Sequence, residues 1–72
     1  MAFDFTIEQH IAVLSERSGY SLELNRVAYR DYPAKLDLRK WHYGQPLKGI
    51  TLTDDEACEL LKALEGVFDG QE

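Results

Sequence analysis

The chain has 72 residues, of which 13 are acidic and 8 are basic, and its formal net charge is −5. A chain of this length forms one domain, residues 1–72, and buries only about 60% of its unfolded surface, so we expect either an efficient core or a second subunit. One cysteine excludes an internal disulfide, no apolar run approaches the ~20 residues of a membrane span, and the pattern of a signal peptide is absent. These features favour a cytoplasmic protein that does not enter a membrane.

The first half of the chain predicts two strands. Within residues 3–14, apolar side chains fall on odd positions and polar ones mostly on even positions, which is the period of a strand. Residues 15–19 predict a turn, and residues 20–30 predict a second strand. The apolar positions of this second strand change phase near Asn25, which predicts a β-bulge there.

The third predicted strand, residues 35–42, has two chemically different faces. Side chains alternate between the faces of a strand. Leu36 and Leu38 therefore point to one side, which we expect to be buried in the core. The opposite face, which we expect to be exposed, carries Lys35, Asp37, Arg39 and the only tryptophan, Trp41.

A fourth strand and a helix complete the predicted fold. Turns at residues 31–33 and 42–46 flank the third strand, and residues 47–52 predict a fourth strand, in which Gly49 indicates a bulge or a close backbone approach.

Thr53 and Glu56 form the pattern of a capping box at the start of a helix. Apolar residues then recur at helical spacing until Gly70 ends the helix: Ala57, Leu60, Leu61, Leu64 and Phe68. The sequence thus predicts an α+β fold, a four-stranded antiparallel sheet followed by one C-terminal helix. Because one helix cannot cover all the apolar surface, including Val67, we expect a homodimer.

The charges are distributed unevenly along the chain. Residues 17–48 hold seven of the eight basic residues and only three acidic ones, a local charge of +4. Local field rather than net charge attracts a ligand over a Debye length of about 8 Å. This middle segment therefore favours a polyanion, although an uneven solvated surface is the simpler alternative.

Aromatic residues between cations indicate single-stranded nucleic acid, because bases stack on aromatic rings and cations contact phosphates. Trp41 is the main stacking candidate, although it could instead pack under a loop or at a dimer contact. Arg39 is the main cation, although it could instead be the ion-pair partner of Asp37. The further candidates are the cations Lys35, Lys48, Arg26 and Arg30 and, for weaker stacking, Tyr29, Tyr32 and Tyr43.

Two motifs, at residues 35–41 and at residues 48–53 before a capped helix, resemble the positive cofactor four family of transcriptional coactivators and their bacterial relatives. Residues 8–15 and 23–25 resemble a bacterial branch of that family, and the likeness covers roughly residues 5–65. The chain lacks the Ser/Lys-rich tail of the eukaryotic members. The resemblance implies a curved sheet, dimerisation through the helices, and single-stranded DNA lying across the sheets. Arg39, Trp41 and Lys48 match its motif positions.

The resulting hypothesis is a homodimer that binds single-stranded DNA or RNA with little sequence preference, near the nucleoid, in transcription, replication or repair. We expect no enzymatic activity, cofactor, metal or small-molecule substrate, because the sequence has no phosphate-binding glycine loop and no paired metal-ligand spacing. The alternative hypothesis is a protein-interaction module whose basic sheet face binds an acidic partner.

Overall fold

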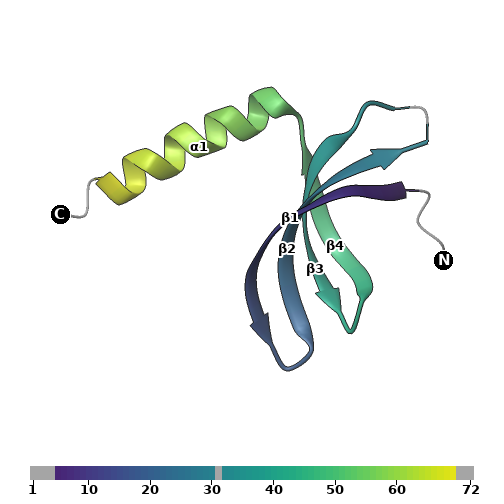
Figure 1. Cartoon of the computed structure of the whole chain (residues 1–72). Helices are drawn as coiled ribbons and strands as arrows, with labels where there is room; N and C mark the ends of the chain where they lie inside the picture. Colours follow the sequence, from purple (N-terminus) through teal and green to yellow (C-terminus); the bar gives the residue numbers. More distant parts are fainter. Residues whose placement is uncertain (1–4, 31, 70–72) are drawn as a thin grey trace.

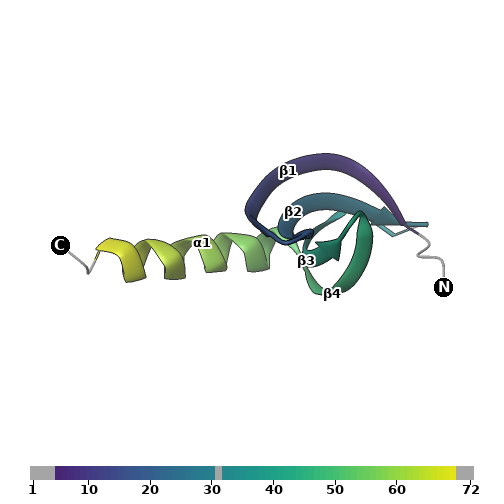
Figure 2. The same cartoon turned by 90° about the horizontal axis from the view of Figure 1, so that it is seen from below.

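The computed structural model of the protein describes residues 5–30 and 32–69. It contains a four-stranded antiparallel sheet in the order β1-β2-β3-β4, followed by one helix, as the sequence predicts. The sheet is open and strongly curved, and the helix extends away from it (Figures 1 and 2). The elements are β1 (Phe5–Arg17), β2 (Tyr20–Tyr29), β3 (Lys35–His42), β4 (Gln45–Leu52) and α1 (Asp54–Asp69).

Two tight turns make the outer strands longer than predicted. β1 continues to Arg17 and β4 begins at Gln45, so the predicted turns at residues 15–19 and 42–46 were too long. Each hairpin closes with two residues of positive φ: Ser18 (52°) and Gly19 (82°), and Tyr43 (47°) and Gly44 (81°). This is the type I′ pattern, whose twist matches that of the flanking strands and lets their pairing continue up to the turn.

The third strand has the predicted bounds, whereas the second ends one residue earlier than predicted. β3 spans Lys35–His42, as predicted, whereas β2 ends at Tyr29 because Arg30 adopts a positive φ of 46°. Parts of three predictions lie outside the described residues: the start of the first strand at residues 3–4, the turn residue Asp31, and the helix end at Gly70.

The irregular pairing lies on β1 rather than on β2. β2 pairs with β3 without interruption from Tyr20 to Val27, so the predicted bulge at Asn25 was wrong. The register between β1 and β2 instead shifts after Ile7, after His10 and again after Val13, each time with one additional residue on β1. The phase change in β2 is therefore not a bulge. Leu24 lies on one face of the sheet and Val27 on the other.

The sheet has two distinct faces, which we name by their residues. The aliphatic face contains a row in which Leu24 pairs with Leu38 and Leu38 with Ile50, and a second row of Leu36 and Leu52. The opposite, polar face contains Asn25, Val27, Asp37, Arg39 and Trp41.

The alternation of β3 is as predicted, but the expected burial of the two faces is reversed. Leu36 and Leu38 are only half-buried and Ile50 is 57% exposed. On the polar face Asp37, Arg39 and Trp41 are buried, against expectation. Lys35, at the end of the same face, is exposed as predicted. Side chains of the concave polar face pack on one another, while the aliphatic face has no cover within the described chain.

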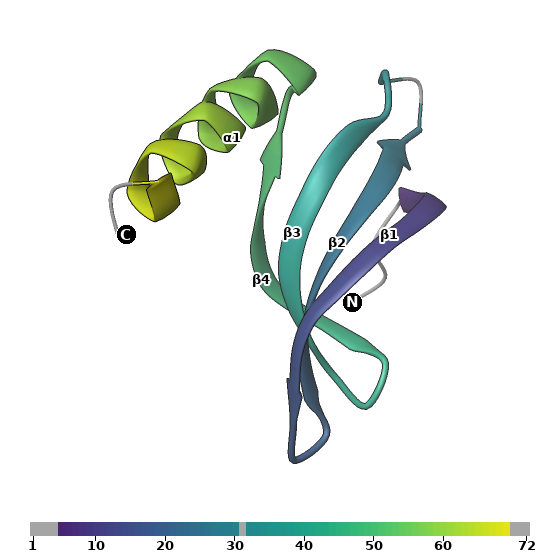
Figure 3. The same cartoon turned by 60° about the vertical axis from the view of Figure 1, so that its left-hand side comes forward.

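The helix begins with the predicted capping box. The backbone N–H of Thr53 donates to Glu56 Oε1 at 2.9 Å, and the backbone N–H of Glu56 donates to Thr53 Oγ1 at 3.1 Å. α1 then points away from the sheet, and none of its residues is buried (Figure 3). Its exposed apolar side chains are Leu60, Leu61, Leu64, Val67 and Phe68. No helix in residues 5–30 and 32–69 is long and apolar enough to cross a membrane.

Candidate nucleic-acid interface

A buried ion pair occupies the centre of the polar face. The Arg39 guanidinium donates from Nε and Nη2 to the two carboxylate oxygens of Asp37, each at 2.8 Å. Its Nη1 donates to the Leu47 carbonyl at 2.8 Å, and Nη2 lies 3.4 Å from the Tyr29 hydroxyl. The hydrogen bonds that Arg39 donates to Asp37 raise the pKa of Arg39 above its ordinary value. The alternative role of Arg39, an ion-pair partner of Asp37, is therefore present in the structure.

Gly49 leaves the space that this arrangement needs. It pairs with Arg39 across β3 and β4, and the register shifts directly afterwards, with an additional residue on β4. A Cβ at Gly49 would lie 2.7 Å from the Cα of Arg39 and 2.6 Å from the carbonyl oxygen of Leu38. Both predicted features of Gly49, a bulge and a close backbone approach, are confirmed.

Trp41 is part of the core, so the expectation of an exposed tryptophan was wrong. It is 9% exposed, and its ring lies edge-on to Phe5, with centroids 6.5 Å apart. Phe5 also contacts Tyr29, at a centroid distance of 5.6 Å. The indole N–H is buried and has no hydrogen-bond acceptor among the described residues. In this conformation Trp41 offers no free ring face to a base.

The polar face opens into a hollow at the β2–β3 connection. Its volume is about 330 Å³, and it is lined by Tyr29, Tyr32, Pro33, Lys35 and Thr51. Tyr32 is 72% exposed, and Lys35 is exposed as well. Tyr29 joins the hollow to Arg39 through its hydroxyl, and Thr51 pairs with Asp37. The hollow thus combines an accessible aromatic ring and a lysine with a polar floor that is connected to the Asp37–Arg39 ion pair.

The other predicted cations do not gather around this hollow. Arg26 lies on the aliphatic face, opposite Leu36, and forms an ion pair of 3.2 Å with Asp54 at the start of α1. Arg30 is exposed directly after β2, and Lys48 is exposed beside the β4 bulge. Of the nine candidate residues, the structure brings together Tyr29, Tyr32, Lys35 and Arg39, whereas Trp41 lies in the core.

Sequence reasoning ranked Tyr32 low and missed Pro33 and Thr51. Tyr32 could have been ranked higher because it lies in a turn next to a proline. A residue in this position holds its ring outside the sheet. Sequence reasoning also missed a ring stack at the hairpin ends, where Tyr20 and His42 lie 4.0 Å apart. Tyr20 and His42 are register partners, which only the strand pairing reveals.

Metal ligation has no support in the described part of the chain. Residues 5–30 and 32–69 contain no group of three or more His, Cys, Asp or Glu side chains that could hold a metal ion. The ring of His10 instead lies 3.1 Å from the side-chain oxygen of the buried Asn25, measured from Nδ1.

Comparison with known proteins assigns no relative: no protein-family model matches the chain, and no curated protein matches it significantly.

Proposed function

We propose that this protein is a homodimer that binds single-stranded DNA, with bases stacked on aromatic rings and phosphates held by cations. The observation that carries this proposal is the hollow at the β2–β3 connection, which is lined by the exposed Tyr32, by Lys35 and by Tyr29, the residue that contacts Arg39. Stacking accepts any base, so we expect little sequence preference.

The hollow favours a single strand over a duplex. A duplex hides the faces of its bases inside the stack, whereas an unpaired base can lie flat on Tyr32. Each contact of this kind contributes roughly 1–3 kcal/mol of binding free energy, measured by alanine substitution. The electrostatic contribution is available to both forms, so the aromatic contact accounts for the discrimination.

The ion pair assigns different roles to the cations. Asp37 neutralises Arg39, and both side chains are buried, with Arg39 9% and Asp37 2% exposed. We therefore propose that Arg39 holds the Tyr29 hydroxyl in place and does not bind a phosphate. Lys35 is exposed at the edge of the hollow and is the better phosphate ligand. Lys48 and Arg30 are also exposed, but they do not line this hollow.

The apolar surfaces support a dimer. α1 has 16 residues and none of them is buried, yet isolated helices of about this length are only marginally stable in water. Its apolar stripe and the uncovered aliphatic face of the sheet are both too apolar to stay in water. A second copy of the chain supplies matching surfaces for both, and a two-fold symmetric arrangement covers them at the same time.

The direct test of nucleic-acid binding is fluorescence anisotropy with a labelled oligo-thymidine of about 20 nucleotides at two salt concentrations, beside a duplex of equal length. We expect tighter binding of the single strand. Tyr32→Ala should weaken it about 5- to 150-fold, which corresponds to the stacking range of 1–3 kcal/mol. Lys35→Ala should weaken binding and reduce the salt slope by about 0.7.

Lys62→Ala is the matched control, because it removes one lysine from the outer surface of α1, where Lys62 pairs with Glu59 at 3.1 Å. It should leave the affinity unchanged. Absence of single-strand binding at low salt would overturn the proposal. A salt-dependent affinity that is equal for single strand and duplex would instead favour the protein-interaction alternative.

The dimer is tested separately, by light scattering during gel filtration. We expect twice the 8.3 kDa mass of the chain. Leu64→Glu, within the apolar stripe, should shift the mass toward one chain, whereas Glu65→Gln at the next position should not. A wild-type mass of 8.3 kDa at micromolar concentration would contradict the dimer.

A further inference from the structure

A second group of aromatic residues lies at the other end of β3, where two hairpin turns meet. The rings of Tyr20 and His42 are stacked, with centroids 4.0 Å apart and an interplanar angle of 14°. Tyr43 lies against His42 at 4.6 Å. Tyr20 is 47% exposed and Tyr43 is 78% exposed, so these rings present open surface to solvent. None of them belongs to the hollow at the β2–β3 connection.

Tyr43 occupies a backbone position that an aromatic residue rarely takes. It is the first central residue of a type I′ turn, with a φ of 47°, where Asn, Asp and Gly are preferred. A bulky residue at positive φ is energetically unfavourable, and such residues cluster at functional sites. The position is fixed by the backbone N–H of Tyr43, which donates to the Gly19 carbonyl at 2.9 Å.

The turn of the first hairpin supports one side of the Tyr43 ring. A Cβ built on Gly19 would lie 2.7 Å from Tyr43 ring atoms, so the ring packs flat on a residue that has no side chain. Contact with Gly19 on one side and 78% exposure overall leave most of the ring free. A residue needed only to close the turn would be Asn, whereas this one presents a flat aromatic surface.

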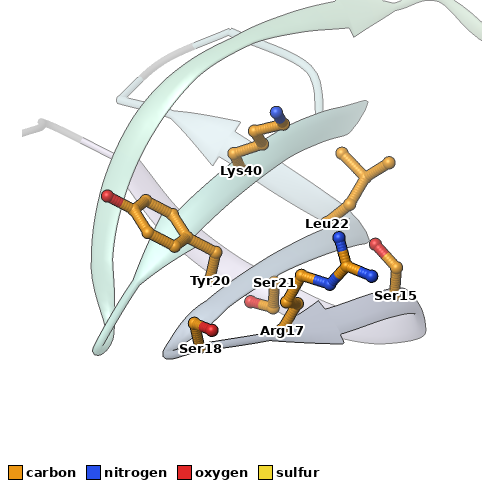
Figure 4. A pocket seen from close by; sticks show the side chains of 7 residues that line it. All are labelled: Ser15, Arg17, Ser18, Tyr20, Ser21, Leu22 and Lys40. Atoms are coloured by element: carbon orange, nitrogen blue, oxygen red, sulfur yellow. The ribbon is translucent and has the colours of Figure 1, made fainter.

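A basic hollow lies beside these rings. Its volume is about 420 Å³, and its lining includes Arg17, Lys40 and Tyr20 together with serine side chains (Figure 4). Arg17 and Lys40 are exposed and stand on different strands at its border. A neighbouring hollow shares Arg17 and Tyr20 and contains one carboxylate, that of Glu16. The two cations exceed this single acid, which suits a phosphate.

We propose that Tyr43, with Arg17 and Lys40, forms a second contact for single-stranded nucleic acid, in which a base stacks on Tyr43 and each of the two cations holds one of the neighbouring phosphates. This inference rests on the proposed function and extends it. The eight residues of β3, at about 3.3 Å per residue, separate the two aromatic sites by roughly 23 Å. Lys40 and Tyr20 lie on the aliphatic face, beyond the Leu24–Leu38 row that the proposed dimer covers. Tyr43 lies in a turn at the rim between the two faces, so a strand that leaves the first hollow passes around this rim to reach the two cations. A strand long enough to reach both sites therefore gains affinity that a short one lacks.

The test compares oligo-thymidines of about 4 and 20 nucleotides by fluorescence anisotropy, because the shorter one cannot span both sites. Tyr43→Asn supplies the preferred turn residue and removes the ring. We expect it to weaken binding of the long oligonucleotide at least about fivefold, and binding of the short one by less than about twofold. Ser18→Asn is the matched control, because Ser18 occupies the equivalent position of the other type I′ turn, at a φ of 52°. It should change neither affinity.

A second variant leaves the turn intact. Arg17→Ala with Lys40→Ala should weaken the long oligonucleotide and lower its salt slope by about 1.4, because two phosphate contacts are lost. Thermal melting verifies that each variant is folded. If the wild-type chain binds the long oligonucleotide and both variants bind it equally well, the second contact is disproved while the proposed function stands. If the wild-type chain binds neither oligonucleotide, the proposed function itself fails.

Discussion

Arg39 and Asp37 lie two residues apart on the same face of β3 and share two hydrogen bonds of 2.8 Å. Both side chains are buried, so neither charge can be compensated by water if the other is removed. The pair also holds the Leu47 carbonyl and the Tyr29 hydroxyl, and it thereby connects β3 to β4 and β2. It acts as the polar centre of a core that contains few large apolar residues.

Removing one member of this pair should be strongly destabilising. We expect Asp37→Asn to lower the free energy of unfolding by about 3–5 kcal/mol, because it leaves the Arg39 charge buried without its counter-ion. Urea denaturation followed by circular dichroism measures the change. The double variant Asp37→Val with Arg39→Met, which removes both charges, should cost less than Asp37→Asn alone. A loss below about 1 kcal/mol in the single variant would show that the pair is hydrated.

The two glycines Gly49 and Gly66 should respond in opposite directions to alanine. Gly49→Ala places a Cβ within 2.7 Å of the Arg39 backbone, and we expect it to destabilise the protein by roughly 1–3 kcal/mol. Gly66→Ala, inside α1, meets nothing within 4 Å and should stabilise the protein by about 0.5–1 kcal/mol. Thermal melts of both variants decide the point, and equal effects would mean that the space beside Arg39 is not restricted.

The capping box should make helix stability depend on pH. Hydrogen bonds with Thr53, foremost that from its backbone N–H, hold the pKa of Glu56 below its ordinary value of 4.5. A carboxylate whose pKa is lowered by folding stabilises the fold above its unfolded pKa, and this contribution is lost as the pH falls through the folded pKa. Glu56→Gln keeps a capping side chain without the charge.

We therefore expect the melting temperature of wild type to exceed that of Glu56→Gln at pH 7, and the difference to shrink as the pH falls below 4.5. A difference that stays constant across this range would show that the charge of Glu56 has no part in capping. Asp55→Asn serves as the control for loss of one carboxylate in the same helical turn.

Trp41 offers a spectroscopic test of the reversed faces. Because it is the only tryptophan and is 9% exposed, its emission should be blue-shifted in the native protein and weakly quenched by iodide. Both properties should change to those of free tryptophan in urea. Strong quenching of the native protein would instead place the ring in solvent, as the sequence pattern alone suggested.

The sequence predicted the strands and the helix better than it predicted which face of the sheet is buried. Strand β3 and the Thr53–Glu56 capping box follow from local patterns, because alternation and capping depend on neighbouring residues. The choice of buried face does not, since it depends on whether the polar residues find partners. Asp37 satisfies Arg39 within one strand, and this makes burial of the polar face possible.

The candidate site was predicted only in part, for a related reason. Lys35 and Tyr29 were identified from charge and aromatic type, but their meeting point depends on the pairing of β2 with β3. Arg26 appeared equivalent to Lys35 in sequence, yet it lies on the other face of the sheet and pairs with Asp54. The β1 bulges depend on the partner strand, and in the sequence only Gln9, which interrupts the apolar face at the first of them, pointed to an irregularity.

The repeated bulges of β1 have a consequence for solubility. β1 and β4 are the two outer strands, and a regular outer strand invites another chain to extend the sheet into an aggregate. Three register shifts on β1 and one between β3 and β4 interrupt the rows of free backbone groups on both sides. These interruptions disfavour open-ended growth from strand to strand, whereas the dimer that we propose uses the aliphatic face and the helix instead.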